Sequence, residues 1–214
     1  MKNKKRFLRR GMTLVETLVA IALFLLGTQA TVLIFSRTIK SKAYTLEMGR
    51  SSLILSRSMG DLTRYIRKAT LSESGAYPIY SADDNDLVLY SDYDKDGIVE
   101  RLHIYLDLNT NIVSMGVRDP SPSFPVSYAS GDGETFQLAS HIINTAGDPM
   151  FSYYNADYPQ DTTNNPVATP ADVSEIRLVK MFLKINIDEN KAPENIQQET
   201  FIELRNLNDY DRIH

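Results

Sequence analysis

The sequence predicts an α+β fold in which one long amino-terminal helix packs on an antiparallel β-sheet. Residues 12–35 form a nearly continuous apolar run, and residues 37–70 contain no proline and show apolar positions at helical spacing. From residue 86 onward, apolar side chains alternate with polar ones, which is typical of half-buried strands. The helix therefore precedes the strands along the chain, instead of alternating with them.

The composition limits the classes of function. The 214 residues suffice for one membrane segment and one modest domain, and the lack of cysteine excludes disulfides and thiolate metal sites. Residues 1–70 contain 14 Lys/Arg and 3 Asp/Glu, a formal charge of +11, whereas residues 71–214 contain 9 and 24, a charge of −15. This asymmetry indicates that the two parts face different surroundings, and the acidic part argues against nucleic-acid binding.

The amino terminus has the pattern of a membrane helix behind a basic leader. Six Lys/Arg and no acidic residue precede Gly11, as expected on the cytoplasmic side. Residues 12–35 contain one charge, Glu16, and a helix of this length extends about 36 Å, enough for a hydrocarbon core of about 30 Å. A secretory signal peptide is one alternative, but its apolar region has only about 7–15 residues. A plain signal anchor fits the length and explains neither Gly11 nor Glu16.

The stretch RGMTLVE, residues 10–16, resembles the class III signal of type IV pilins and of the pseudopilins of type II secretion. The resemblance implies that a prepilin peptidase cuts between Gly11 and Met12, and that Met12 becomes the N-methylated first residue. Glu16 then stands at the fifth mature position, where this family has its glutamate. The family usually has Phe where this chain has Met12.

A carboxylate in hydrocarbon is costly, so Glu16 needs a partner. Cleavage would create a positively charged α-amino group on Met12, about one helical turn from Glu16. Pairing with this amine, or with that of a neighbouring subunit as the family implies, offsets part of the cost. We expect Glu16→Ala or Glu16→Val to leave the protein in the membrane but to block its assembly.

The helical pattern continues beyond the membrane segment. Apolar residues three and four apart predict one buried face, which consists of Leu55, Met59, Leu62, Ile66 and Ala69. The opposite face is basic and is interpreted as solvated, with attraction to acidic lipid or acidic neighbouring domains as the alternative. The predicted segments are a leader at 1–11, a membrane or filament-core helix at 12–35, an amphipathic extension at 36–72, and an extracytoplasmic β-rich domain at 73–214.

Alternating patterns predict the strands of this domain. The segments are 86–91, 98–108, 112–117, 148–154, 175–188 and 200–207, and the short apolar segment 136–144 is ambiguous. In the second strand, the buried face is expected to consist of Leu102, Ile104, Leu106 and Leu108. Two polar, proline-containing loops are expected at 118–135 and 155–173. The order of these pieces resembles minor pseudopilins and minor pilins of the J-like and W-like kinds.

The DYDKDG turn at residues 92–97 is a candidate calcium site. Asp92, Asp94 and Asp96 offer hard oxygen ligands at alternate positions, and Glu100 offers a fourth. An EF-hand would need a bidentate Glu at the twelfth position, where this chain has His103, so we expect an isolated calcium loop. A metal-free acidic β-turn is the alternative interpretation.

No phosphate-binding loop, HExxH motif or histidine-centred site occurs in the sequence, so we expect a protein that is not an enzyme. We expect a structural subunit, made as a prepilin in the cytoplasmic membrane and assembled into a type II secretion pseudopilus or a type IV pilus. The resemblance implies other pilin-like subunits, the prepilin peptidase, the inner-membrane assembly platform and its ATPase as partners. The alternatives are a tip-located binding or adhesion module of a pilus or DNA-uptake filament, and a membrane-anchored enzyme.

Overall fold

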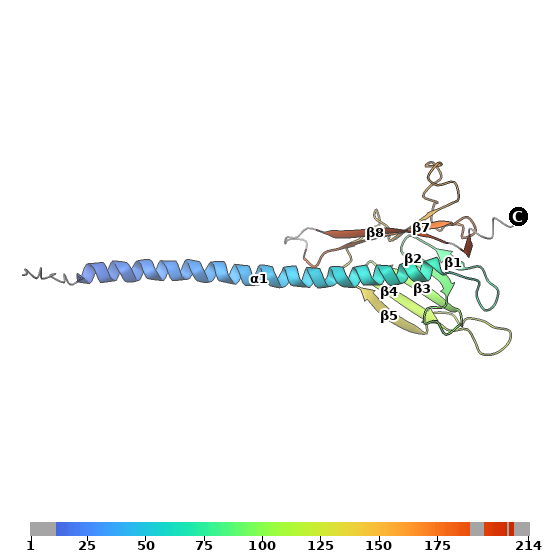
Figure 1. Ribbon diagram of the computed structural model, residues 1–214, viewed down its shortest axis with the longest axis horizontal. Helices are drawn as coiled ribbons and strands as arrows, with labels where there is room; N and C mark the ends of the chain where they lie inside the picture. Colours follow the sequence, from blue (N-terminus) through green and yellow to red (C-terminus); the bar gives the residue numbers. More distant parts are fainter. Residues whose placement is uncertain (1–11, 189–194, 205, 208–214) are drawn as a thin grey trace, which may run out of the picture. The chain divides into compact units, whose positions relative to one another are not determined.

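The computed structural model describes residues 12–188, 195–204 and 206–207 (Figure 1). These residues form one helix and eight strands, in the α+β arrangement that the sequence predicts. The elements are α1 (Leu14–Arg67), β1 (Ile79–Ala82), β2 (Asp86–Ser91), β3 (Glu100–Asp107), β4 (Ile112–Arg118), β5 (Glu134–Ala139), β6 (Phe151–Tyr154), β7 (Leu178–Ile185) and β8 (Ile196–Glu203).

The chain divides into two compact units, Met1–Leu46 and Glu47–His214. In the first unit, every residue from Met12 to Ala43 is exposed, although most side chains up to Phe35 are apolar. This part of α1 is long and apolar enough to cross a membrane, and a signal sequence would share that property. An apolar helix surface of this extent indicates an environment other than water.

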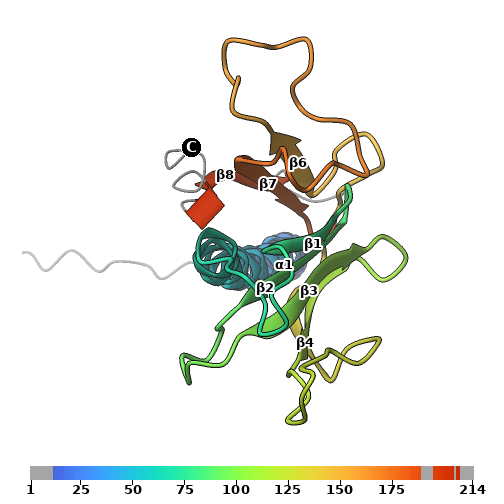
Figure 2. The same cartoon turned by 90° about the vertical axis from the view of Figure 1, so that its right-hand side faces the viewer.

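The second unit contains two antiparallel sheets, with strand orders β1-β2-β3-β4-β5 and β6-β7-β8. Figure 2 shows the 47–67 part of α1 between them. The hydroxyl of Ser58 donates to the carbonyl of Leu138 in β5 at 2.7 Å, and that of Ser56 donates to Gln198 in β8 at 3.1 Å. The helix therefore contacts both sheets, where the sequence predicts a single sheet.

The core confirms the predicted buried face of the helix. Leu55, Leu62 and Ile66 are fully buried, and Met59 and Ala69 are 2% exposed. They pack with the inner faces of both sheets, where about 25 cal/mol of stabilisation comes from each Å² of apolar surface removed from water. The 47–67 helix segment is therefore part of the domain core.

Several element ends differ from the prediction, among them those of β6 (residues 151–154, predicted as 148–154) and β7 (residues 178–185, predicted as 175–188). The helix ends at Arg67 and not at residue 72, and the amide of Lys68 donates to the carbonyls of both Arg64 and Tyr65 in a tightened last turn. Leu108 is 42% exposed and not on the buried face, because β3 ends at Asp107. The Asp107 carboxylate accepts the amide of Asn109 and thus begins the turn to β4.

The sequence patterns did not predict β1 and gave incomplete bounds for β5 and β8. β1 is only four residues long and lies between the predicted helix and the first predicted strand, where no element was expected. β5 occupies the first half of the ambiguous 136–144 segment and starts two residues before it. β8 starts at Ile196 and not at residue 200. The sequence did not indicate this earlier start, because half-buried and exposed residues alternate over 196–201 and weaken the apolar signal.

The β1–β2 turn connects the two sheets. The carbonyl of Asp84 accepts the amide of Phe151 at the start of β6 at 2.9 Å, and the Asn85 side chain accepts that of Met150 at 3.0 Å. The buried hydroxyl of Tyr153 donates to the carbonyl of Asp83 at 2.8 Å. These bonds fix the start of β6 against the turn of the five-stranded sheet.

Candidate functional site

The predicted processing site lies at the boundary of the described residues. Gly11 lies outside them, and Met12 is the first residue described, with 67% of its surface exposed. Cleavage after Gly11 and methylation of Met12 therefore stay predictions.

Glu16 forms a capping box at the amino terminus of α1. Its Oε2 accepts the backbone amide of Thr13 at 2.9 Å, and the Thr13 hydroxyl accepts the amide of Glu16 at 3.3 Å. The Thr13 hydroxyl also donates to Glu16 Oε2 at 3.1 Å. Two amides that the helix leaves unpaired thus find partners. The T-x-x-E spacing before an apolar run is a sequence signal for this motif.

The capping box provides a second reason, besides pairing with a positive amine, for a polar residue at position 16. A carboxylate in the first turn interacts favourably with the positive end of the helix dipole, independently of any partner subunit. The cap also anchors the carboxylate to Thr13, the residue next to the α-amino group that cleavage would create on Met12. A glutamine at position 16 retains the hydrogen bond of a capping box but lacks the charge, so it can separate the two roles.

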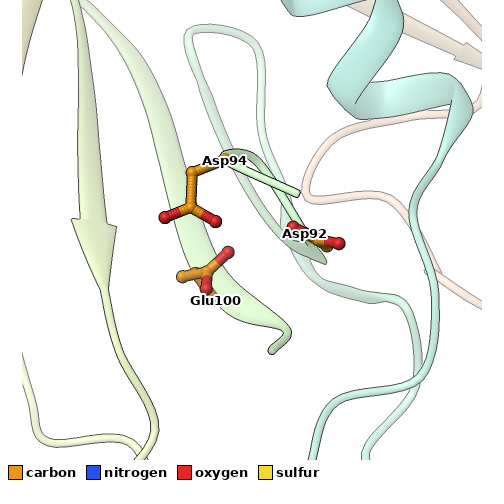
Figure 3. Close-up of side chains that lie close together, drawn as sticks. All are labelled: Asp92, Asp94 and Glu100. Carbon is orange, nitrogen blue, oxygen red and sulfur yellow. The ribbon is translucent and has the colours of Figure 1, made fainter. Parts of the chain in front are cut away.

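The acidic hairpin between β2 and β3 brings together three of the four predicted calcium ligands. One carboxylate oxygen each from Asp92, Asp94 and Glu100 lies within 4.8 Å of the others. Figure 3 shows the carboxyl groups of Asp94 and Glu100 turned toward each other, with Asp92 to one side. Asp96 is not part of this group, and its Oδ1 accepts the amide of Ile98 at 2.8 Å.

The three oxygens fit a calcium ion by separation. Calcium–oxygen distances of about 2.4 Å allow two ligands of one ion to lie up to about 4.8 Å apart, and the remaining ligands can be waters or carbonyls. The hairpin is also a satisfied turn without a cation, because Asp92 accepts the amide of Lys95 at 2.6 Å and Asp94 accepts that of Asp96 at 3.1 Å. Gly97 has a φ of 91°, which suits the turn.

Glu100 has the most perturbed environment of the three. Its side chain lies on the inner face of β3 and the residue is 3% exposed, with Oε2 accepting the amide of Tyr93 at 3.1 Å. Burial, with smaller contributions from the charges of Asp94 and Asp96, raises its pKa to about 7, and the bond from Tyr93 opposes this. A buried carboxylate beside other carboxylates is stabilised either by a proton or by a cation.

A cavity of about 650 Å³ adjoins this carboxylate group. The hairpin forms one side of the cavity, and the loop between β4 and β5, residues 119–133, contributes to another. Carboxylates dominate the charged lining, which consists of Glu73, Asp94, Asp96, Glu100, Arg118, Asp119 and Glu134. The chemistry of this lining suits a cation better than an anion.

His103 lies on the face of β3 opposite Leu102 and Ile104, and the sequence did not predict its partners. Its Nε2 lies 2.8 Å from Asp86 in β2, and its Nδ1 lies 3.0 Å from Asp132 in the 119–133 loop. No local pattern in the sequence indicates a contact with a residue 29 positions away. His141 is exposed and its Nδ1 contacts the hydroxyl of Ser140, while His214 lies outside the described residues.

No known protein family, curated protein or solved structure matches the chain. The class is therefore defined by the architecture alone, which is pilin-like: one long amino-terminal apolar helix continues into a helix segment that packs on antiparallel sheets.

Proposed function

We propose that this protein is a minor pilin or minor pseudopilin that assembles into a type IV pilus or a type II secretion pseudopilus. The observation that supports this most directly is the unbroken 54-residue helix α1. Its first part is apolar and exposed on all sides, and its last part contributes Leu55, Met59, Leu62 and Ile66 to the core of a β-rich domain. A helix that only anchored the domain would not need to continue into that core.

The mechanism is packing. Before assembly, the apolar part of α1 lies in the cytoplasmic membrane with the domain outside. On assembly, contacts with lipid are exchanged for contacts with the helices of other pilin-like subunits, driven by van der Waals packing and by satisfaction of buried charge. The prepilin peptidase, the inner-membrane platform and its ATPase complete the set of partners. No step requires a catalytic group on this chain.

The proposal is tested first by the amino-terminal mass of the full protein recovered from its native membranes. We expect a chain that starts at N-methylated Met12. A chain that keeps Met1 in cells with an active prepilin peptidase would identify a plain signal anchor. A chain that starts near Thr31 would identify a secreted domain, and either result would overturn the proposal.

The charge of Glu16 is tested by Glu16→Gln in the native host. We expect this variant to insert into the membrane normally but to be lost from filaments, because a glutamine cannot pair with a positive amine of Met12. The matched control is Thr13→Val, which removes the side-chain half of the capping box and leaves the carboxylate in place. Incorporation of Glu16→Gln at wild-type levels would contradict the charge pairing and leave capping as the sole role.

We further propose that the acidic hairpin binds calcium through Asp92, Asp94 and Glu100. The convergence of their oxygens and the burial of Glu100 support this proposal. Asp96 would contribute by its charge and by shaping the turn. Calcium would neutralise the carboxylates and fix the β2–β3 hairpin outside the cytoplasm, where calcium is plentiful.

A second candidate function is a tip-located binding module. The 119–133 loop presents Phe124 with 95% of its surface exposed. The second half of this loop is bonded to the domain: the Tyr128 hydroxyl donates to the carbonyl of Val99 at 2.6 Å, and the amide of Gly133 donates to the carbonyl of Val117 at 2.8 Å. An exposed aromatic residue on an anchored loop is typical of recognition surfaces.

A further inference from the structure

His103 is placed between two carboxylates that come from different parts of the chain. Asp86 belongs to β2, whereas Asp132 belongs to the 119–133 loop. The ring nitrogens lie 2.8 Å from Asp86 Oδ2 and 3.0 Å from Asp132 Oδ2. The side chains of His103 and Asp132 are 27% and 20% exposed, so both are partly shielded from water. We call Asp86, His103 and Asp132 the histidine clamp.

The chemistry of imidazole makes the clamp dependent on protonation. Neutral histidine has one N–H and can donate to only one of the two carboxylates, whereas the imidazolium ion donates to both. The hydrogen bond with Asp86 makes the largest contribution to raising the pKa of His103, burial opposes it, and the bond with Asp132 raises it further. The arrangement therefore favours the doubly protonated ring.

Gly116 makes room for the Asp132 side of the clamp. It lies directly opposite His103 in the β3–β4 ladder. A Cβ atom at this position would lie 2.1 Å from Cγ of Asp132, a separation that no packing tolerates. The lack of a side chain at Gly116 thus lets the carboxylate reach the imidazole across β4.

Other charged and titratable groups around the clamp come from β3 and β4. The Tyr105 ring of β3 stacks on His103 with a centroid distance of 4.5 Å. Arg101 of β3 donates to the carbonyl of Gly131, and Arg118 of β4 donates to the carbonyls of both Gly131 and Asp132. These guanidinium groups contact the loop backbone at all ordinary pH values, so His103 is the group in this set that changes charge near neutrality.

We propose that the histidine clamp is a protonation-dependent tether that holds the 119–133 loop against the outer face of the five-stranded sheet and weakens as the pH rises. The proposal does not depend on filament assembly. The loop contains the exposed Phe124 and lines the acidic cavity through Asp119. The tether would therefore fix both the recognition surface and one wall of the cavity in acidic and neutral surroundings.

The linkage between protonation of His103 and opening of the loop sets the sign and size of the pH dependence. A histidine whose pKa is raised in the closed loop stabilises that loop fully at pH values below the ordinary pKa of about 6.5, and this stabilisation is lost as pH rises through the raised value. The loop-opening constant then increases between the two plateaus by ten raised to the pKa difference between the closed and open loop. The measured fold-change in the opening constant therefore gives this pKa difference, and we expect the fold-change to be greater than one.

The experiment measures both quantities on the full-length protein in detergent micelles with EDTA present. Histidine NMR between pH 5 and 9 gives the pKa of His103, with its signal assigned by its loss in His103→Gln. Hydrogen exchange of the loop amides, corrected for the intrinsic pH dependence of exchange, gives the opening constant. The amides of β7 serve as the reference for global unfolding.

We expect a His103 pKa above 6.5 and loop protection that, expressed relative to the protection of β7, falls across that pKa. In His103→Gln, protection should be low and independent of pH. Gly116→Ala should lower loop protection while retaining the histidine. Gly60→Ala is the control and should leave loop protection unchanged, because an added Cβ there meets nothing within 4 Å. A His103 pKa at or below 6.5, or constant loop protection in the wild type, would overturn the proposal. If loop protection in His103→Gln fell with pH as it does in the wild type, the proposal would also be overturned. The pH dependence would then be assigned to Glu100, whose pKa of about 7 lies in an overlapping range.

Discussion

Replacing Glu100 with glutamine should stabilise the calcium-free protein at neutral and alkaline pH. Glu100 is 3% exposed and lies beside Asp94 and Asp92, so its negative charge is poorly solvated when no cation is present. Glutamine is close in size and can still accept the amide of Tyr93, which donates to the Glu100 carboxylate at 3.1 Å. The substitution therefore removes the charge with little change in packing.

The magnitude follows from the pKa of Glu100, which burial raises from 4.5 to about 7. Because the folded protein retains this proton over a range where the unfolded chain has lost it, the free energy of unfolding falls as pH rises from 4.5 to about 7 and is constant above. A pKa difference of about 2.5 corresponds to about 3 kcal/mol, and water in the adjacent cavity will screen part of this, so we expect about 1 to 3 kcal/mol. The free energy of unfolding of Glu100→Gln should exceed that of the wild type by this amount at pH 8 and should equal it at pH 4.

Calcium should make the wild type more stable than Glu100→Gln, which is the reverse of the order expected without calcium. A ligand present at 100 times its dissociation constant stabilises the folded protein by about 2.7 kcal/mol, and Glu100→Gln lacks one of the three carboxylate ligands. Urea unfolding of the full chain in detergent, followed by tyrosine fluorescence, measures both effects, since the chain has 12 tyrosines and no tryptophan.

The control is Glu134→Gln, which alters an exposed carboxylate of the same cavity. It should change the free energy of unfolding by less than about 0.5 kcal/mol. Equal stability of Glu100→Gln and wild type at pH 8 in EDTA would refute the burial argument. A full calcium response in Glu100→Gln would refute the proposed ligand set.

Three further predictions concern the domain. Leu62→Ala should cost about 3 kcal/mol of unfolding free energy in the same assay, because Leu62 is fully buried. Leu53→Ala, which alters a 73% exposed residue of the same helix, should cost less than about 0.5 kcal/mol. Asn144→Ala should cost about 2 to 3 kcal/mol, since its buried amide bonds to Asp148, Phe182 and Lys184. Deletion of the 118–135 or the 155–173 loop should abolish adhesion or secretion in the host while filaments still form, and loss of filaments would contradict the binding-module function.

The fold was predictable where apolar spacing is regular over many residues. The helix stripe through Leu55 and Leu62 and the alternation around Ile104 both depend on local periodicity, and the structure buries all three residues. The second sheet was not predictable in the same way, because it depends on how distant strands pair. β8 pairs along the whole of β7, yet its own residues are mostly polar or half-buried.

The sites were predictable only where the partners are close in sequence. The Asp92–Glu100 group lies within nine residues of one hairpin, so its ligand spacing is visible in the chain. The histidine clamp depends on Asp132, which reaches His103 only because the neighbouring strand has Gly116 opposite the histidine. This is a three-dimensional coincidence of a loop, a strand register and a missing side chain, and no spacing in the sequence indicates it.

Glu16 shows how a structural role can coexist with a functional one without replacing it. The capping box with Thr13 provides a local reason for a polar residue at the start of α1. Glutamine meets that need equally well and avoids the cost of placing a charge in hydrocarbon. A glutamate in an apolar segment of 24 residues is thus better explained by a positive partner than by capping alone. The amine that cleavage would create on Met12, of the same chain or of a neighbour, has the charge and the position that such a partner requires.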